Sequence, residues 1–528
     1  MSTETTSATR QIARAASTVM AAFFLSSLIG LARQIIVSRE FGTTAVIDAY
    51  NAASTYPDLI FSLIAGGALA SAFIPTITDF LTKGERRSAW YLTSAIANLV
   101  TLVLTTTSLL SMLLAPWIVA HVLAPNFNPA QQELTTELLR ILLLAPTLFG
   151  LSGLIMGLLN AHQVFLAPAL APAMYPLGMI LGVLLLSPQM GIYGLAWGAV
   201  LGALMHLSIQ IPALLRLPAR QYFASLGLTF PAVREVWRLM APRLLGVGAV
   251  QINFVVNTIL ATGQTEGSLT AIKYAWAIMA MPQVIIAQAI AIAALPTFSA
   301  QAARGELGSL RQALAATLRG VILLSLPASL ALVMLRIPII QLLFQRGEFD
   351  VNSTELVAWA LLWYATGLVG HSVVEIVSRA FYALHDTLTP VLASVGAMTL
   401  NVALSIALSA LFENLGLPPH GGLALANSLA TTLEMFALLF LMRRRLGGIQ
   451  GGELLTAGLQ TAAAGLVMSA GLWAWLSLTQ DQPTWFVVGG SMVVGLILFT
   501  TTALLLGIRQ AWAIAGELYQ RATGKKAV

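Results

Sequence analysis

The stretch VFLAPALAPAMYPLGMILGVLLLS, residues 164–187, has no charged side chain and is long enough to cross a bilayer, which takes about 20 apolar residues in a helix. Such stretches recur along the 528-residue chain, in which 58% of the residues are apolar and only 9% are charged. A soluble domain carries about 25% charged residues, so most of this surface must face lipid. Lipid-facing backbone must pair all its polar groups, and the runs are far longer than the roughly 10-residue strands of a barrel. The sequence therefore predicts an all-α polytopic membrane protein.

Hydropathy along the chain predicts about fourteen transmembrane helices. Their approximate bounds are 16–37, 47–70, 89–113, 136–160, 164–187, 191–215, 236–262, 268–295, 310–335, 354–382, 388–412, 420–442, 455–478 and 484–507. The first run has no persuasive cleavage site, so we interpret it as a retained span rather than a signal peptide.

The basic residues fall on alternate connections between these spans. One side has Arg10, Arg14, Lys83, Arg86, Arg87, Arg216, Arg220, Arg234, Arg304, Arg311, Arg443, Arg444, Arg445, Arg509, Arg521, Lys525 and Lys526; the other has essentially Arg39, Arg336 and Arg346. The positive-inside rule then places both termini in the cytoplasm.

Several classes of function are excluded by composition. There is no cysteine for a disulfide or thiolate site, and the six histidines are scattered without metal-site spacing. The net charge of +6 lies in the short loops as a topology signal, so we expect no nucleic-acid partner. No Walker motif is present for ATP. The loops also have no acidic cluster of the DxxD kind that a membrane transferase needs for metal, so we expect no enzyme and no cofactor.

Short motifs repeat along the chain at a nearly constant offset of 221 to 228 residues. Pro75-Thr76 with Lys83-Gly84-Glu85 returns as Pro296-Thr297 with Arg304-Gly305-Glu306. The other repeated pairs are Leu159-Asn160-Ala161-His162 with Tyr382-Ala383-Leu384-His385, and Gly194-Leu195-Ala196 with Gly422-Leu423-Ala424. A six-span unit returns the chain to the same side, so the two copies are parallel and related by a pseudo-twofold axis along the membrane normal. Transporters of this architecture rock two bundles about a central site.

The repeat divides the chain into four parts. We predict a six-helix N-terminal lobe over 1–215, an amphipathic linker over 216–235, a six-helix C-terminal lobe over 236–445, and two extra helices with a basic tail over 446–528. The linker is expected to lie on the inner membrane surface, anchored by Tyr222 and Phe223. The alternative to transport is a static scaffold that arose by duplication.

Several motifs resemble the MurJ/MviN family of the multidrug/oligosaccharidyl-lipid/polysaccharide exporter superfamily. The similar stretches are Leu28-Ile29-Gly30-Leu31-Ala32-Arg33, Phe41-Gly42 with Asp48-Ala49-Tyr50, Gly66 to Pro75, Leu343-Phe344-Gln345-Arg346-Gly347-Glu348-Phe349, and Ser378 to Pro390. They extend from the first span to the eleventh.

The resemblance implies an alternating-access flippase that moves lipid II, the polyprenyl-pyrophosphate-linked peptidoglycan precursor, from the inner to the outer leaflet of the bacterial cytoplasmic membrane. It implies a cationic cavity for the pyrophosphate, a groove for the lipid tail at the last two spans, and coupling to membrane potential or a monovalent cation. We expect lipid-linked oligosaccharide and membrane lipids as partners, a monomer, and contacts with cell-wall synthesis proteins. The alternatives are a flippase for another lipid-linked glycan, a small-molecule antiporter of the same superfamily, and a silent scaffold.

The sequence departs from the family at three positions. Ser27, Phe61 and Ala277 stand where the resemblance implies cavity arginines, and Arg33 is the one that remains. This departure leaves the identity of the headgroup open.

Ionisable residues inside spans are costly, so we treat them as candidate site residues. Arg33 suits bidentate phosphate binding, although it can also snorkel to the interface. Asp48 and Lys273 each lie nine residues before a proline, Pro57 and Pro282, so they occupy equivalent places in the two copies. We predict that the two close an outer gate and that Lys273 also faces the substrate; the alternative is two separately solvated charges. Asp58 is a further substrate-site candidate, with a structural role as the alternative.

The second copy supplies the candidates for gating or ion coupling. Glu375 and Arg379 have the i,i+4 spacing of an intrahelical ion pair, which serves either as a relay with His371 or as a structural pair. Glu434 is an acid within a span, and Asn401 and Asn427 are candidates to add carbonyl oxygens to a cation site around it. The spacing does not specify a metal.

Overall fold

The computed structural model describes residues 22, 25–64, 68–512 and 516, and these residues form two compact units. Met1–Gly267 and Arg346–Phe349 make up the first unit, and Ser268–Gln345 and Asp350–Val528 make up the second. Helices account for nearly all of the described residues, and no strand occurs among them, so the predicted all-α fold is confirmed. The predicted orientation depends partly on five basic residues that lie outside the described residues, namely Arg10, Arg14, Arg521, Lys525 and Lys526.

The first unit begins with a helix over residues 25–41. Its other helices are α2 (Ala45–Ile64), α3 (Ala68–Thr82), α4 (Arg86–Leu113), α5 (Ala115–Ile118), the π-helical turn η1 (Val119–Leu123), α6 (Pro129–Leu142), α7 (Ala145–Ala161), α8 (Leu166–Leu181), the π-helical turn η2 (Gly182–Leu186), α9 (Ser187–Met190), α10 (Ile192–Ser208), α11 (Ile211–Leu215) and α12 (Pro231–Thr262).

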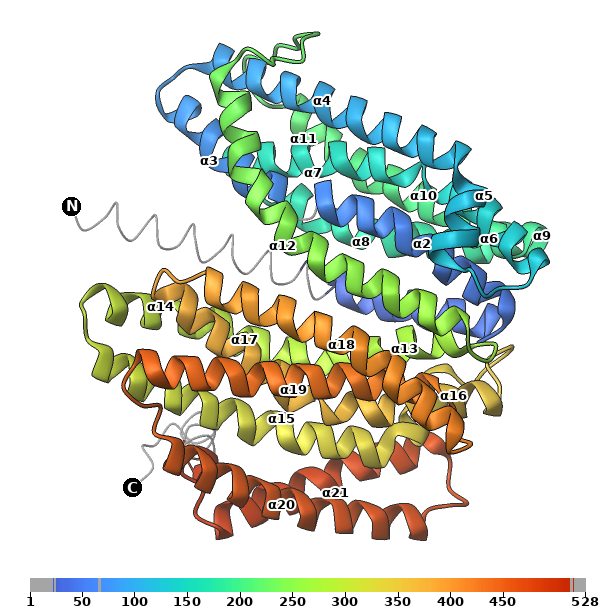
Figure 1. The fold of residues 1–528 in the computed structure, drawn as a ribbon, viewed down its shortest axis with the longest axis vertical. Coiled ribbons are helices and arrows are strands. Elements are labelled where there is room, and N and C mark those ends of the chain that lie inside the picture. The colour runs from blue at the N-terminus through green and yellow to red at the C-terminus, as the bar shows by residue number, and fades with distance from the viewer. Residues whose placement is uncertain (1–21, 23–24, 65–67, 513–515, 517–528) are drawn as a thin grey trace. The chain divides into compact units, whose positions relative to one another are not determined.

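The second unit continues the helical pattern with longer elements. They are α13 (Ser268–Gln283), the π-helical turn η3 (Val284–Gln288), α14 (Ala289–Ala303), α15 (Leu307–Phe344), α16 (Val351–Thr366), α17 (Leu368–Ala383), α18 (Leu388–Asn414), α19 (His420–Arg445), α20 (Gly451–Leu478) and α21 (Thr484–Leu505). Figure 1 shows α20 and α21 side by side, and both pack on α15. Arg319 of α15 and Glu453 of α20 form an ion pair at this contact.

Each of the fourteen predicted spans overlaps one helix or one run of consecutive helices, although residues 16–21, 23 and 24 of the first span and 65–67 of the second lie outside the described residues. Among the described residues, ten such segments are long and apolar enough to cross a membrane, or eleven if α16 and α17, which meet at a 44° bend, form one span. The three others are the helix over 25–41, the α2–α3 run and α12. The structure is consistent with fourteen spans, although length and apolar character alone do not establish that number.

The first pair of repeated motifs adopts the same turn in both copies. Gly84 and Gly305 have positive φ angles of 77° and 71°. The next residue closes the turn in the same way: the Glu85 amide donates to the Phe80 carbonyl at 2.9 Å, and the Glu306 amide to the Gln301 carbonyl at 3.0 Å. Each turn is followed by a long helix, α4 or α15. The matched geometry supports the duplication that the motifs predicted.

The second pair of motifs also forms matching turns. Gln163 and His385 both have left-handed φ angles, 60° and 58°, directly after α7 and α17. The following amides, of Val164 and Asp386, donate back to carbonyls five residues earlier, at 2.9 and 3.0 Å. The backbone therefore aligns Gln163 with His385. The sequence motif had aligned His162 with His385, so the two alignments differ by one residue.

The segment Arg346–Phe349 is part of the first unit, although α15 and α16 on either side of it belong to the second. The Glu348 amide donates to the Arg39 carbonyl at 2.9 Å. Gly42 and Gly347 lie at this contact, and both have positive φ angles. A Cβ on Gly42 would lie 2.9 Å from the Glu348 carbonyl carbon. Only glycine fits such a close backbone approach without strain.

The predicted linker over 216–235 is for the most part not helical. Residues 216–230 form turns and irregular backbone, and α12 begins at Pro231, before the predicted start of the seventh span. Asn98 of α4 donates to the carbonyls of Phe223 and Ser225, both at 2.9 Å, so the backbone of this segment is paired without helical bonds. α12 packs on α2 and α3 within the first unit. The two compact units are defined by packing, whereas the lobes were inferred from the repeated motifs. The predicted lobe boundaries therefore stay a prediction.

We predict that Gly84→Ala and Gly305→Ala each destabilise the protein by about 1–2 kcal/mol, the cost of a left-handed conformation for an L-residue. A Cβ at either position meets nothing within 4 Å, so only backbone strain changes. Thermal unfolding of the detergent-solubilised protein, followed by tryptophan fluorescence, measures the effect. Gly320→Ala, in the middle of α15 and equally open, is the control and should be stabilising. Equal unfolding temperatures for Gly84→Ala and wild type would contradict the strain argument.

Candidate functional site

Close contact between α8 and α10 is the foundation of the candidate site. Gly178 of α8 and Gly182 at the start of η2 meet Gly198 and Gly202 of α10, and a Cβ on Gly198 would lie 2.8 Å from the Gly182 Cα. Small residues spaced by four let two helices approach closely in lipid, where packing rather than water exclusion drives association. This approach places Tyr175 of α8 beside Gly202, near His206 on the next turn of α10.

A cavity of about 320 Å³ lies in the first unit between α2, α6, α7, α8 and α10. Asp58, exposed to this space, is the one acidic residue of its lining. Much of the remaining lining is aromatic or proline. These residues are Pro57, Phe61, Pro146, Phe149, Pro172 and Tyr175. The lining is thus mostly apolar, and its polar side chains are Ser54, Asp58, Tyr175 and His206.

The aromatic rings of this cavity form one cluster around Phe149. Its ring centroid lies 4.9 Å from that of Phe61 and 5.0 Å from that of Tyr175. The His206 ring meets Phe149 edge to face at 5.3 Å. Aromatic rings that pack offset or edge to face at these distances attract one another, and this attraction adds to the stabilisation from burial alone. The contacts therefore hold the cavity wall in a defined shape.

A buried polar network orients His206. The Ser152 hydroxyl lies 2.6 Å from the His206 Nδ1 and 3.1 Å from the His206 carbonyl. Gln210 donates from its side-chain amide to the Ser152 hydroxyl at 2.6 Å and to the same carbonyl at 3.0 Å. All three residues are buried, and one of their polar atoms, the Gln210 Oε1, has no hydrogen-bond partner.

Arg33 is half-buried in the helix over residues 25–41 and donates from Nη1 to the Met179 sulfur at 3.5 Å. Met179 is on α8, one turn beyond Tyr175. Tyr175 in turn lines the cavity together with Asp58. The structure thus brings Arg33 and Asp58, both predicted as substrate-site residues, to the same side of the first unit. Whether either one binds substrate stays a prediction.

Asp48 is 3% exposed and lies in the first turn of α2, where it accepts the Gly267 amide at 2.8 Å. The Ala45 amide donates to Glu266 at 2.6 Å, so α2 is tied to the loop before α13 at two points. Lys273 is half-buried in α13. Because Asp48 and Lys273 belong to different units, the proposed gate between them stays a prediction.

The expected ion pair in the second unit is present. Arg379 donates to Glu375 at 2.7 Å within α17, with side chains 32% and 23% exposed. One turn before Glu375, the His371 Nε2 lies 3.1 Å from the Asn427 side-chain oxygen of α19. The geometry fits the structural alternative for Glu375 and Arg379 and does not test a role in coupling.

The hydrogen bonds that the structure describes for the remaining coupling candidates go to separate partners. Glu434 accepts a hydrogen bond from Ser394, Asn401 accepts one from Ser405, and Asn427 contacts His371. In the described part of the chain, no group of three or more acidic or histidine side chains is arranged to hold a metal ion. The predicted cation site at Glu434 and Asn401 stays a prediction.

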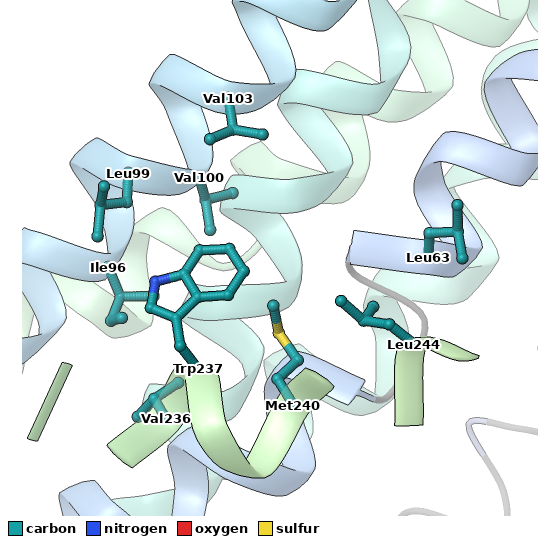
Figure 2. A pocket seen from close by; sticks show the side chains of 9 residues that line it. All are labelled: Leu63, Ile96, Leu99, Val100, Val103, Val236, Trp237, Met240 and Leu244. Carbon is teal, nitrogen blue, oxygen red and sulfur yellow. The ribbon is translucent and has the colours of Figure 1, made fainter. Parts of the chain in front are cut away.

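A second cavity in the first unit has a different character. Figure 2 shows its nine lining side chains, among them Trp237 and Met240 of α12 and Ile96, Leu99 and Val103 of α4, and all nine are apolar. Its volume is about 300 Å³. Such a lining offers dispersion contacts to hydrocarbon and no charge to a headgroup, and its one polar group is the indole N–H of Trp237.

Tyr175, His206, Ser152 and Phe149 were absent from the sequence-based candidates. Nothing in their spacing marks a site, because they come from three helices and meet only in the fold. The repeated glycines of α8 and α10 were the available signal, since close helix packing brings the residues flanking them together.

Comparison with known proteins gives a consistent result. Residues 37–495 match the family model described as lipid II flippase MurJ. A relative named lipid II flippase MurJ from Burkholderia cenocepacia is 29% identical over 89% of this chain and 90% of its own length. A relative from Rhizobium meliloti, named probable lipid II flippase MurJ, is 30% identical over 74% of each chain.

Solved structures show the same fold. A structure titled lipid II flippase MurJ, inward closed conformation, has a TM-score of 0.78, covering 92% of this chain and 98% of its own at 22% identity. An inward-facing multidrug resistance transporter of the MATE family, in the MOP superfamily, has a TM-score of 0.67 at 16% identity, covering 81% of this chain and 96% of its own.

We predict that Ser152→Ala lowers the stability of the protein by about 1–2 kcal/mol, because it leaves two buried polar groups short of a partner. The control is Ser491→Ala, an equally buried serine whose hydroxyl bonds only to the Val487 carbonyl of its own helix. Scanning fluorimetry in detergent should give a clear drop in unfolding temperature for the first variant and little change for the second. Equal shifts in the two variants would contradict the proposed network.

Proposed function

We infer that this chain, which belongs to the MurJ lipid II flippase family, moves lipid II from the inner to the outer leaflet of a bacterial cytoplasmic membrane. The observation that carries this function is the family match over residues 37–495, which spans most of both units. The fold shared with a solved lipid II flippase supports it. Movement by alternating access fits a chain built from two copies of one helical unit.

The headgroup that must cross the membrane carries a pyrophosphate, and this charge determines what the path requires. A charge placed in hydrocarbon costs at least about 2.5–3.5 kcal/mol, so the protein must supply partners along the way. We propose Arg33 as the principal cation of the first unit. A guanidinium forms two parallel hydrogen bonds to a phosphate, which a point charge does not. Lys273 is the proposed cation of the second unit.

We propose that transport involves no covalent chemistry on the substrate, and that a single copy is sufficient because one chain contains both halves of the repeat. Glu375, Arg379, Glu434 and Asn401 are our candidates for coupling transport to membrane potential or to a monovalent cation. The first three are ionisable groups within spans of the second unit, which supports a response to potential or to a cation, and Asn401 would add a carbonyl oxygen.

A different lipid-linked glycan is the second candidate substrate. Phe61, which stands where the resemblance implies a cationic residue, is part of the aromatic wall around Asp58. A lining with fewer cations than expected suits a headgroup with less negative charge.

Expression of this protein should restore growth to a strain depleted of its own lipid II flippase, and Arg33→Ala should abolish that rescue. Loss of the guanidinium removes the bidentate contact to pyrophosphate. Arg33→Lys should rescue only partly, because lysine keeps the positive charge but cannot form the two parallel hydrogen bonds of a guanidinium. Colony formation on depletion medium, with membrane levels checked by immunoblot, is the measurement.

Arg87→Ala, at an exposed arginine in the first turn of α4, is the matched control and should rescue like wild type. Failure of well-expressed wild-type protein to rescue would favour another glycan over lipid II. Full rescue by Arg33→Ala would remove Arg33 from the site.

The proposed orientation, with both termini in the cytoplasm, rests on the distribution of loop arginines. Because the chain has no cysteine, single substitutions label without background. In intact spheroplasts, an impermeant maleimide should label Asp481→Cys, in the exposed loop between α20 and α21, but not Arg220→Cys. Permeabilisation should expose Arg220→Cys. The reverse order of labelling would invert the topology.

A further inference from the structure

Three connections of the first unit meet around a cleft of about 250 Å³ that is separate from the two cavities described above. The end of α3 and the start of α4 form one side, the turn after α7 forms another, and the segment before α12 closes the third. The lining residues are Leu81, Arg86, Trp90, Ala161, His162, Gln163 and Pro218. Four of these seven side chains carry nitrogen and none is acidic, so the cleft is suited to an anion.

The positive charge of the cleft comes from Arg86, an exposed residue in the first turn of α4. No described residue forms an ion pair or a hydrogen bond with its side chain. Lys83, in the same turn, differs in this respect because it is already paired with Asp79 at 2.6 Å. The neighbouring acid Glu85 is not part of the lining. Arg86 therefore brings to the cleft a charge that no acidic residue of the lining offsets.

The His162 ring is held by its own helix. Its Nδ1 lies 3.0 Å from the Leu158 carbonyl, one turn earlier in α7. A carbonyl oxygen can only accept, so Nδ1 carries a proton in this contact. Nε2, on the opposite side of the ring, has no partner in the part of the chain that the structure describes, and protonation of the ring makes it a second N–H donor.

Gln163 and Trp90 add further donors from fixed positions. Gln163 has a left-handed φ of 60°, which is uncommon for a residue of this kind, and the Val164 amide closes the turn by donating to the Leu159 carbonyl at 2.9 Å. Trp90 is only 8% exposed. Neither the Gln163 side-chain amide nor the Trp90 indole N–H bonds to a described residue. The cleft thus combines a guanidinium, an amide and an indole on well-defined backbone.

The corresponding turn of the second unit carries an acid of its own. There Asp386 stands where the first unit has Val164, since the turns after α7 and α17 match. The Thr389 amide and hydroxyl donate to Asp386 at 3.0 and 2.8 Å, and these bonds together with the charge of Arg445 lower the pKa of the carboxyl. The second unit therefore supplies a carboxylate to this turn from its own chain. Because the first unit has valine instead, a ligand has to supply the anion.

The cleft lies where spans end, at the end of α3 and of α7 and the start of α4. Beside Trp90, the Tyr91 ring packs edge to face on Phe223 and Phe230. Tryptophan and tyrosine concentrate at the headgroup level of a bilayer. In the proposed orientation this level belongs to the inner leaflet, where anionic lipid headgroups bind to basic pockets between helices.

We propose that this cleft is a binding site for a phosphate group, with Arg86 as the principal contact and His162 and Gln163 beside it. A guanidinium forms two parallel hydrogen bonds to phosphate oxygens, and the flanking N–H groups bond to the oxygens that remain. Two sources share this chemistry, the headgroup of an anionic phospholipid and inorganic phosphate. The site is independent of the proposed transport activity, because none of its residues lines the cavity around Asp58 and Arg33 is not among them.

The test measures the binding of two probes, dioctanoyl phosphatidylglycerol and inorganic phosphate, to the full-length protein in a non-ionic detergent by microscale thermophoresis. Wild type should bind at least one of them. Arg86→Gln should weaken the tightest binding step about ten-fold, as expected for the loss of a charge-assisted contact. Arg87→Gln is the matched control, because Arg87 is an equally exposed arginine of the same helical turn that does not line the cleft, and its affinity should equal that of wild type.

A second variant adds charge instead of removing it. Gln163→Glu places a carboxylate in the cleft at an exposed position, as Asp386 does in the matching turn, and should abolish the same binding step. This variant decides the question if Arg86→Gln fails to fold, which the unfolding temperature of the unliganded protein reveals.

The outcomes distinguish the sources and the proposal itself. Arg86-dependent binding of phosphatidylglycerol alone identifies a lipid headgroup, and equal dependence for inorganic phosphate identifies a site for soluble phosphate as well. Binding of neither probe to wild type overturns the site. So does an equal loss in Arg86→Gln and Arg87→Gln, which indicates diffuse surface charge, or an affinity unchanged by Arg86→Gln and Gln163→Glu. The growth assay of the proposed function depends on Arg33 and is unaffected by each of these results.

Discussion

A backbone amide in hydrocarbon can bond only to other atoms of the protein, and the whole structure conforms to that constraint. Even the irregularities inside the spans preserve pairing: where the helices shift register, at η2 and η3, they do so through π-helical turns rather than by opening. Prolines occur within α2, α3, α8, α13, α14 and α15, where neighbouring helices tolerate the lost bond. Irregular backbone, such as residues 216–230, is bonded to side chains of α4 instead.

The same constraint shapes the site. Since helices are the only building blocks, a polar site must be made from side chains that face one another across helix contacts. The glycines of α8 and α10 make such a contact close enough for Tyr175 and His206 to line one cavity with Asp58. The Ser152 network then holds His206 in one orientation at a depth where an unsatisfied ring nitrogen would be costly. The polar side chains of the site are therefore positioned by apolar packing between helices.

Much of the fold could be predicted from the sequence because hydropathy and the positions of glycine are local signals. The order of the spans, the duplication and the Glu375–Arg379 pair all follow from spacing along one chain segment. The contacts of Asp48 with Gly267 and of Arg33 with Met179 join residues far apart in sequence, so no local pattern reveals them. The irregular course of residues 216–230 could not be predicted from the amphipathic pattern of the linker, because their backbone is bonded by side chains of α4 that lie far away in the sequence.

The segment Arg346–Phe349 has a consequence for biogenesis. It completes the first unit but is synthesised only after α15 of the second. The first unit therefore cannot be completed in the order in which the ribosome makes the chain. The Arg39 carbonyl receives its hydrogen bond from the Glu348 amide only after about eighty residues of the second unit have been synthesised. The two halves are thus interlocked by the order of translation, and a gene cut between them would separate the first half from a piece of its own structure.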